Sequence, residues 1–417
     1  MALSLLSSTS RVETPFITAT IGGYSFGIYS RRDRNIINSH GNFVEATVDY
    51  PNYMKSLTIE KINGTVNTYT LVMQYAIREG NDPNFLEKIF SKASRDRSIV
   101  LSYGDLSAPS FIYREEEAII TDITSAIDLN NSVISYTLKC TSKSLALAAG
   151  TYSFPKLYAK PSDIIKQLLY DTRYGLLEVF YGMRDKGKVL AKSLIIGDDR
   201  PVTIEAKRNI SIFNYLSYLV SCMSNIVDTE STLIRNSKYS LIVVDDITSE
   251  WGGPYFKVTK VDANINENSL DTYELDIGYP GQNIVLDFTL DDNQAWSILY
   301  DYSGSIQQSS YVYRINNSGN IEAEYSPTLA KSAELLKTTE AEKSWWTTVT
   351  QFPISGTLTL KGLLRPAILM TYIKLNVLFY GQKHISSGYY IVTKQTDSID
   401  ESGYKTTLKL TRIKGES

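Results

Sequence analysis

The stretch SSGYYIVTKQTDSIDESGYKTTLKLTRIK, residues 386–414, determines how the rest of the chain is interpreted. Apolar residues alternate with polar ones over Tyr389–Thr393 and again over Thr406–Ile413. The segment between them, residues 397–403, is rich in Asp, Ser and Gly. Alternation on both sides of a polar, glycine-containing segment predicts a β-hairpin with a wide loop.

The same pattern occurs near the end of the first third of the chain. Ile391–Asp400 (IVTKQTDSID) aligns without a gap with Ile119–Asp128 (IITDITSAID), and five of these ten positions are identical. Downstream, TTLK at 406–409 aligns with YTLK at 136–139. A looser third copy spans Tyr255–Ile277. We infer that one chain contains two related β-units near its two ends.

Length and composition limit the class of protein. A chain of 417 residues exceeds one ordinary core and predicts about two to four domains. Hydrophobic content of 43% with 21% charged residues is typical of a folded, soluble protein. A formal net charge of −3 provides no basic surface for nucleic acid. Thirty tyrosines favour strands and surfaces that pack against other proteins.

The ends of the chain and its cysteines add three expectations. The opening residues MALSLLSSTSR lack the basic and apolar regions of a secretory signal. No apolar run approaches the length of a membrane span. Cys140 and Cys222 are far apart in sequence, so we expect two buried free thiols.

The predicted fold class is α+β, predominantly antiparallel β. About seven strands and one helix in the first unit suggest a small antiparallel barrel or sandwich. Asp82–Pro83 predicts the start of that helix, Asn84–Ser94, and Ser162 and Asp163 are expected to cap a second helix. The predicted divisions are 12–150, the first β-unit; 155–228, an α/β domain; 229–280, a β-rich domain; 281–300 with 351–415, the second β-unit; and 301–350, an insertion with a polar helix.

Two short motifs resemble catalytic or nucleotide-binding loops but lack their context. Gly23–Gly27 matches G-x-S-x-G, yet the residues that follow predict a strand, where a nucleophile elbow requires a helix. Gly182–Val189 resembles a phosphate-binding loop, but Val189 occupies the position of the Mg²⁺-binding hydroxyl. We interpret the first as a glycine-bounded hairpin and the second as a charged hairpin tip.

Metal ligands and paired carboxylates are equally sparse. Asp262, Asn264 and Asn266 have the spacing of the first ligands of a calcium loop, but the glycine and the final glutamate are missing. His40 and His384 do not cluster with each other or with cysteine. We therefore expect no catalytic, cofactor or metal site.

Two further sequence features receive structural interpretations. The run Glu115–Glu117 is interpreted as a solvated strand edge that discourages edge pairing. Trp345–Trp346 is interpreted as an anchor in a core or domain contact.

The final hairpin resembles the C-terminal signature of phage tail hub proteins, the baseplate hubs of contractile tails and related injection machines. The matching segments are Phe352–Lys361, Ser387–Val392, Gly403–Arg412, Tyr69–Ile77, Asn81–Pro83, Phe85–Ser94 and Ile99–Asp105. The segments lie near both ends, and the resemblance as a whole spans about half of the chain.

The resemblance implies a non-enzymatic structural role. Family hubs carry two tail-tube-like β-barrels per chain and form trimers, so that six barrels make a ring of pseudo-sixfold symmetry. Such a ring docks on the tail tube or a distal tail protein and receives the central spike on its threefold side. Its channel holds the tape measure protein and later passes DNA.

The resemblance also implies a place of action, and it leaves alternatives open. The protein would be made in the host cytoplasm, would belong to the virion, and would not insert into a membrane. One alternative is a spike-associated cell-wall hydrolase, which needs a carboxylate pair in a cleft. Another is a β-rich adhesin that binds carbohydrate through its tyrosines.

Overall fold

The chain is mostly antiparallel β-structure, and a large part of it is described by a computed structural model. The described residues are 15–22, 24–28, 35–37, 43–45, 54–62, 65–77, 80, 82–93, 98–105, 112–143, 150–177, 195, 199, 201–223, 238–245, 254–261, 270–276, 285–292, 311–315, 321–325, 354–362, 369–384, 386–400 and 402–415.

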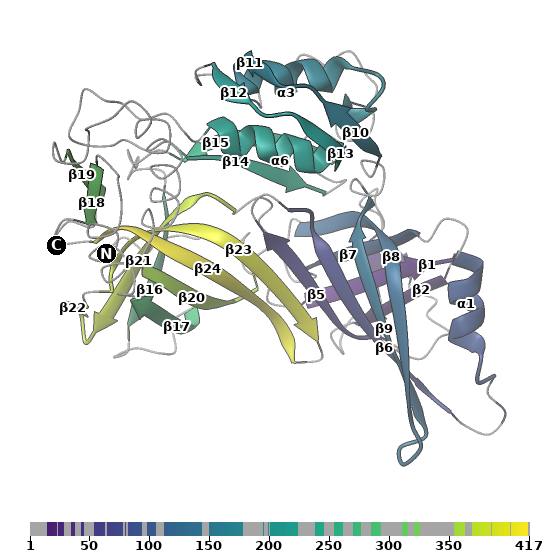
Figure 1. The fold of residues 1–417 in the computed structure, drawn as a ribbon. Helices are drawn as coiled ribbons and strands as arrows, with labels where there is room; N and C mark the ends of the chain where they lie inside the picture. The colour runs from purple at the N-terminus through teal and green to yellow at the C-terminus, as the bar shows by residue number, and fades with distance from the viewer. Residues whose placement is uncertain are drawn as a thin grey trace.

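One 14-stranded sheet runs through both terminal parts of the chain (Figure 1). Its strands, in spatial order, are β17 (Val285–Asp292), β20 (Ile354–Lys361), β24 (Gly403–Gly415), β23 (Gly388–Asp400), β5 (Met54–Ile62), β6 (Thr68–Ala76), β9 (Val133–Ser142), β8 (Ile112–Asp128), β7 (Ser98–Asp105), β1 (Pro15–Ile21) and β2 (Tyr24–Ile28). β21 (Tyr372–Phe379) pairs with β23, with β22 (Gln382–Lys383) and, in parallel, with β16 (Asp271–Asp276).

We call strands β1, β2 and β5–β9 the first module, and strands β17, β20, β21, β23 and β24 the second module. Burial alternates along the strands as the sequence pattern predicts. In β9, for example, Ile134, Tyr136, Leu138 and Cys140 point into the core while their neighbours are more exposed. Helix α1 (Phe85–Ala93) begins after Asp82, whose carboxylate accepts a hydrogen bond from the Asn84 N–H at 3.0 Å.

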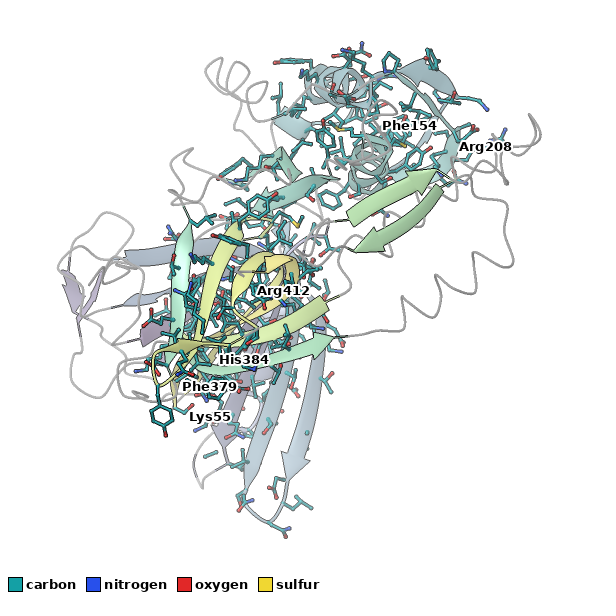
Figure 2. All side chains as sticks on the ribbon, turned by 90° about the vertical axis from the view of Figure 1, so that its left-hand side faces the viewer. Lys55, Phe154, Arg208, Phe379, His384 and Arg412 are labelled. Atoms are coloured by element: carbon teal, nitrogen blue, oxygen red, sulfur yellow. The ribbon has the colours of Figure 1, made fainter. Side chains whose placement is uncertain are left out.

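A separate α/β layer lies above the sheet in Figure 1. It consists of α3 (Pro161–Tyr170) and α6 (Ile212–Met223) with three strand pairs: β10 (Thr151–Phe154) with β13 (Lys207–Ser211), β11 (Leu157–Ala159) with β12 (Val202–Ile204), and β14 (Lys238–Val244) with β15 (Tyr255–Val261). Phe154, labelled in Figure 2, stacks on Tyr215 of α6 with ring centroids 3.6 Å apart. Two small hairpins complete the described strands: β3 (Asn35–Ile37) with β4 (Phe43–Glu45), and β18 (Tyr311–Ile315) with β19 (Ile321–Tyr325).

Five strands of the first module have counterparts in the second, in the same order. The succession β5-β6-β9-β8-β7 matches β17-β20-β24-β23-β21. Leu71 of β6 pairs with Leu57 and Leu138, just as Leu358 of β20 pairs with Phe288 and Leu408. The registers of all four ladders define these equivalent residues, first module first: Leu57 and Phe288, Leu71 and Leu358, Leu138 and Leu408, Ile119 and Ile391, Ile99 and Ile373.

Irregularities of the strands also occur at equivalent places. The ladder of β8 and β9 skips Thr121, and the ladder of β23 and β24 skips Thr393. The Thr121 hydroxyl donates to the Lys139 carbonyl at 3.0 Å, and the Thr393 hydroxyl donates to the Lys409 carbonyl at 3.2 Å. A second pair of bulges occurs at Lys55 in β5 and Leu286 in β17. Shared register and shared bulges confirm the predicted duplication of the outer hairpins.

The structure corrects two details of the repeat. The third copy predicted over Tyr255–Ile277 is not a hairpin, because β15 pairs with β14 and β16 pairs with β21. The wide polar loop predicted over 397–403 is also wrong, because β23 continues to Asp400 and turns directly into β24. The polar residues 397–400 belong to a strand because β5 of the first module pairs with them.

Two hydrophobic cores underlie the fold. The core of the first module includes Leu71, Leu138 and the α1 residues Leu86 and Ile89. The second core joins the second module to the α/β layer. The predicted caps Ser162 and Asp163 lie inside α3, where Pro161 takes the first position and the Ser162 hydroxyl donates to buried Asp199. Helix α6 begins after Ser211, which accepts from the Asn214 N–H at 3.2 Å.

We predict that Leu71→Ala and Leu358→Ala destabilise the protein similarly, each by about 2–5 kcal/mol, because both side chains are fully buried at the centre of equivalent ladders. Urea unfolding monitored by far-UV circular dichroism measures the change. Leu129→Ala, at an exposed turn, is the control and should change stability by no more than about 0.5 kcal/mol. A large loss at only one of the two leucines would contradict equivalent packing.

Candidate functional site

The two modules meet where strand β23 of the second pairs with strand β5 of the first. The ladder is antiparallel and runs from Lys394 opposite Ile62 to Asp400 opposite Ser56. We call this contact the cis joint, because it joins segments of one chain. It makes the two modules one continuous sheet (Figure 1).

Strand β23 changes its partner along its length. Residues Gly388–Ile391 pair with β21 of their own module, and residues from Lys394 onward pair with β5. The bulge at Thr393 separates the two halves. A β-bulge bends a strand and increases its twist, so this position redirects the distal half of β23 toward the first module.

The buried face of the cis joint carries apolar and polar groups. Ile399 is 1% exposed and packs in the core of the first module, opposite Leu57. Tyr404 of β24 belongs to the same core. The second module therefore contributes side chains to the core of the first.

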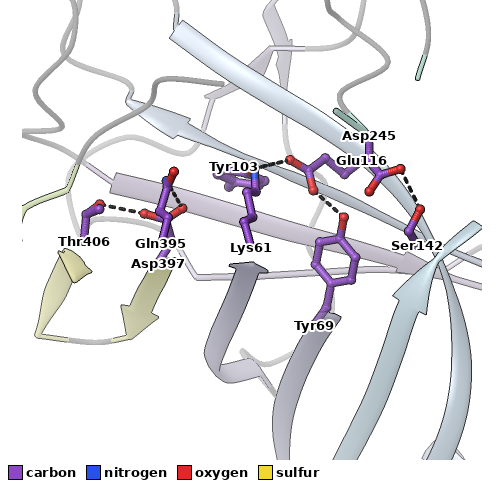
Figure 3. A network of polar contacts seen from close by, with 9 residues as sticks. All are labelled: Lys61, Tyr69, Tyr103, Glu116, Ser142, Asp245, Gln395, Asp397 and Thr406. Atoms are coloured by element: carbon purple, nitrogen blue, oxygen red, sulfur yellow. Dashed lines mark hydrogen bonds and ion pairs between the residues drawn. The ribbon is translucent and has the colours of Figure 1, made fainter. Parts of the chain in front are cut away.

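Glu116 of β8 lies at the centre of a buried polar network (Figure 3). Its Oε1 accepts from Lys61 Nζ at 2.9 Å and from the Tyr103 hydroxyl at 2.6 Å, and its Oε2 accepts from the Tyr69 hydroxyl. Burial raises the pKa of the Glu116 carboxyl, but Lys61 and the two tyrosines outweigh burial and hold this pKa below its ordinary value. Glu116 is therefore ionised, and Lys61 neutralises it.

Asp397 extends this network from the second module. Its carboxyl accepts from the Thr406 hydroxyl at 2.6 Å and from the Gln395 amide at 2.7 Å. Burial raises the pKa of Asp397 to about 6, although Lys61 acts to lower it. Because burial disfavours its charged form, Asp397 remains protonated in mildly acidic solution.

Two contacts outside this network also hold the modules in place. On the more exposed side of the cis joint, Lys394 Nζ lies 2.9 Å from Glu60 Oε1. Beside the α/β layer, the Ser142 hydroxyl at the end of β9 donates to buried Asp245, which follows β14, at 2.6 Å. The first module is thus tied to both of its neighbours.

The structure corrects the interpretation of Glu115–Glu117 as a solvated strand edge. This run pairs with β7, whereas the ladder of β8 with β9 begins only at Ala118. The Glu116 side chain is 0% exposed, and Glu115 and Glu117 are half-buried. The sequence did not predict that Lys61 and Asp397 are buried near Glu116. A lysine and an aspartate in apolar-alternating strands were the available signal, but the pairing of β5 with β23 that brings them together was not apparent.

The other candidate residues do not form a reactive group in the described part of the chain. Ser25 of Gly23–Gly27 lies within β2, opposite Thr20, so the predicted hairpin is confirmed. His384 lies beside Phe379, with ring centroids 5.2 Å apart (Figure 2). Among described residues, no three His, Cys, Asp or Glu side chains are grouped as metal ligands. Gly182–Val189, the positions 262, 264 and 266, His40 and Trp345–Trp346 lie outside the described residues.

The cysteines are free thiols. Cys140 is buried, and burial raises the pKa of its thiol to about 12. Cys222 in α6 is half-buried, which differs from the full burial expected for it. Within the described ranges, no helix combines the length and apolar character needed to cross a membrane.

Comparison with known proteins yields matches among solved structures. No family model and no curated protein matches the sequence. A tail protein from Neisseria meningitidis is 9% identical, with 96% of this chain and 97% of that chain covered and a TM-score of 0.49. This chain is similar to phage tail proteins.

Two further matches are of the same kind. The tail protein of prophage MuSo2 from Shewanella oneidensis is 10% identical, covers 97% of this chain and 100% of that chain, and has a TM-score of 0.48. An E. coli type VI secretion component, whose description notes similarity to phage T4 tail proteins, is 9% identical, covers 89% of this chain and 77% of that chain, and has a TM-score of 0.42.

We predict that Asp397→Asn removes a pH dependence of stability. The folded protein holds this proton with a pKa of about 6, against 3.8 for an ordinary aspartate. The stabilisation is therefore full below pH 3.8 and is lost as pH rises through about 6. From pH 4 to pH 7, the wild type should lose on the order of 1–3 kcal/mol of unfolding free energy relative to the variant.

Urea unfolding at a series of pH values measures this difference. Asp400→Asn is the matched control from the same strand, because hydrogen bonds from Ser402 lower the pKa of Asp400 and give the opposite slope. Parallel pH profiles for the wild type and Asp397→Asn would contradict the prediction.

We predict that Lys61→Met destabilises the protein by about 3–5 kcal/mol, because it leaves the Glu116 carboxylate buried without its cation. The double variant Lys61→Met/Glu116→Gln should recover a large part of this loss. Thermal and urea unfolding of the single and double variants give the coupling free energy. Additive effects of the two substitutions would show that the residues do not act as a pair.

Proposed function

We propose that this protein is a structural hub of a phage tail or baseplate. In this proposal residues 12–150 and residues 281–300 with 351–415 form two tube-like β-barrels. Three chains close into a ring whose six similar units match the sixfold tail tube, while its threefold symmetry matches the central spike. The protein acts without catalysis and belongs to the virion.

One observation carries this proposal: the same five-stranded arrangement occurs twice in one chain, and its two copies are joined edge to edge. A contact that places one copy beside the next in a continuous sheet is head-to-tail. Head-to-tail contacts generate a ring when their rotation closes. A chain with two equivalent units halves the number of chains needed for a ring of given symmetry.

The partners follow from such a ring. One face of the ring would meet the tail tube or a distal tail protein, and the opposite face of the ring would hold the spike. The lumen would contain the tape measure protein before DNA passes. In this proposal the residues between the modules comprise an α/β domain at 155–228, a β-rich domain at 229–280 and an insertion at 301–350. The contractile character of the tail is part of the same proposal.

Tail particles that contain this chain provide the test. Quantitative mass spectrometry should find three copies of this chain in each tail, which is half the number of subunits in one hexameric tube ring. A density map should place these three copies in one collar. A stoichiometry that matches the tube subunit, or a location outside the collar, would overturn the proposal. Release of sugar or peptide from cell walls by the purified chain would instead support a hydrolase, and retention on a glycan surface would support an adhesin.

A further inference from the structure

The two strand edges that are equivalent to those of the cis joint lie elsewhere in the same sheet, and neither is paired with another described strand. Strand β8, the equivalent of β23, pairs with β7 only as far as Ile119. Beyond that residue, no described strand pairs with its outer edge. Strand β17, the equivalent of β5, ends the order of described strands at the other side. The two edges that meet in the cis joint thus recur, unpaired among described residues, on the outside of the chain.

We propose that the distal half of β8 pairs with β17 of a second copy of this chain, in the register of the cis joint. We call this contact the trans joint. The inference rests on the ring proposed above and identifies the strands that would close it. Each of these two edges therefore pairs with the other edge on an identical chain.

Exposure of equivalent residues supports this partner. Ile399 is 1% exposed in the cis joint, whereas its equivalent Ile127 is 63% exposed. Ile123 on the same strand is 42% exposed. The whole distal half of the β8–β9 hairpin, 121–132, is exposed, and Figure 1 shows it extending beyond the body of the first module. An exposed apolar strand edge of this kind is a template for pairing with another chain.

Strand β17 lacks the cover that β5 has. Leu57 and Ile59 of β5 are fully buried beneath the cis joint. Their equivalents Phe288 and Leu290 are half-buried, although both pack against the second core. Phe288 contacts Tyr390 edge to face, with ring centroids 6.1 Å apart. In the cis joint, Ile399 covers Leu57. An isoleucine from a second chain in the same position would complete the burial of Phe288.

The equivalences fix the register of the trans joint. Ile399 pairs with Leu57 in the cis joint, so Ile127 pairs with Phe288 in the trans joint. Ser125 then lies opposite Leu290. Asp128 lies opposite Asp287, a like-charged pair that weakens the exposed end of the ladder. Ile123 then lies opposite Asp292, where the cis joint has Gln395 opposite Lys61. On this face β8 carries Ile123 and Ser125 where β23 carries Gln395 and Asp397, so β8 contributes the more apolar edge.

Cysteine cross-linking of mixed chains tests the contact directly. One chain carries Ile127→Cys and the other carries Phe288→Cys, both in a Cys222→Ser background. Directly opposite residues of an antiparallel ladder lie about 4.5–5.5 Å apart, within the range of a disulfide. Mild oxidation of the mixture should produce a covalent dimer on a denaturing gel, and each chain alone should not.

Matched variants define the register and the strength. Ile123→Cys mixed with Phe288→Cys should not cross-link, whereas Leu57→Cys/Ile399→Cys within one chain should form an intramolecular bond. Ile127→Lys should weaken association on the order of tenfold or more, because it removes an apolar side chain from the joint. Tyr158→Lys, at an exposed site of the α/β layer, should leave association unchanged. Asp287→Asn should strengthen association.

The outcomes separate this inference from the ring itself. If native mass spectrometry shows a trimer but Ile127 and Phe288 do not cross-link, the trans joint is wrong while the ring stands. If the chain remains a monomer both at high concentration and in tail particles, the ring and the trans joint fail together. Circular dichroism of each variant confirms that it is folded before it is scored.

Discussion

The arrangement of the two modules depends on pairing the outer edge of β5. An edge strand in a hydrophobic environment must find partners for its backbone N–H and C=O groups, because a buried unpaired group costs as much as a lost hydrogen bond. In this chain the partner is β23, and the Lys394–Glu60 contact across the ladder joins residues 334 positions apart in sequence. The N-terminal and C-terminal parts therefore fold into one sheet, and neither completes its core alone.

The polar network follows from the same pairing. Once β23 lies on β5, Gln395 and Asp397 enter the interior together with Lys61 and Glu116. Removing such groups from water is expensive, and their mutual attraction compensates only when hydrogen bonds satisfy the remaining atoms. The network thus contributes less to net stability than to the choice of partner and register. A shift by one residue would turn Asp397 and Ile399 to the opposite face of the sheet.

Two copies of one arrangement have acquired different edges. In the cis joint β23 contributes buried Gln395 and Asp397, whereas the equivalent positions on the free edge of β8 carry Ile123 and Ser125. This difference has a physical use, because two joints with identical surfaces would allow each edge to pair with the wrong copy. Distinct polar and apolar surfaces make the correct pairing more favourable than the alternatives.

The sequence by itself determined the strand-rich fold, the helix α1 and the start of helix α3 to within a few residues, and the repeat between residues 119–139 and 391–409. These features are local, since alternation, caps and short-range similarity are written in neighbouring residues. Only the tertiary structure decided that residues 397–400 are strand, that Glu116 is buried, and that β15 and β16 do not form a third hairpin. Each of these features depends on pairing with a strand that is distant in the chain. The local sequence of an edge strand does not indicate which distant strand will pair with it.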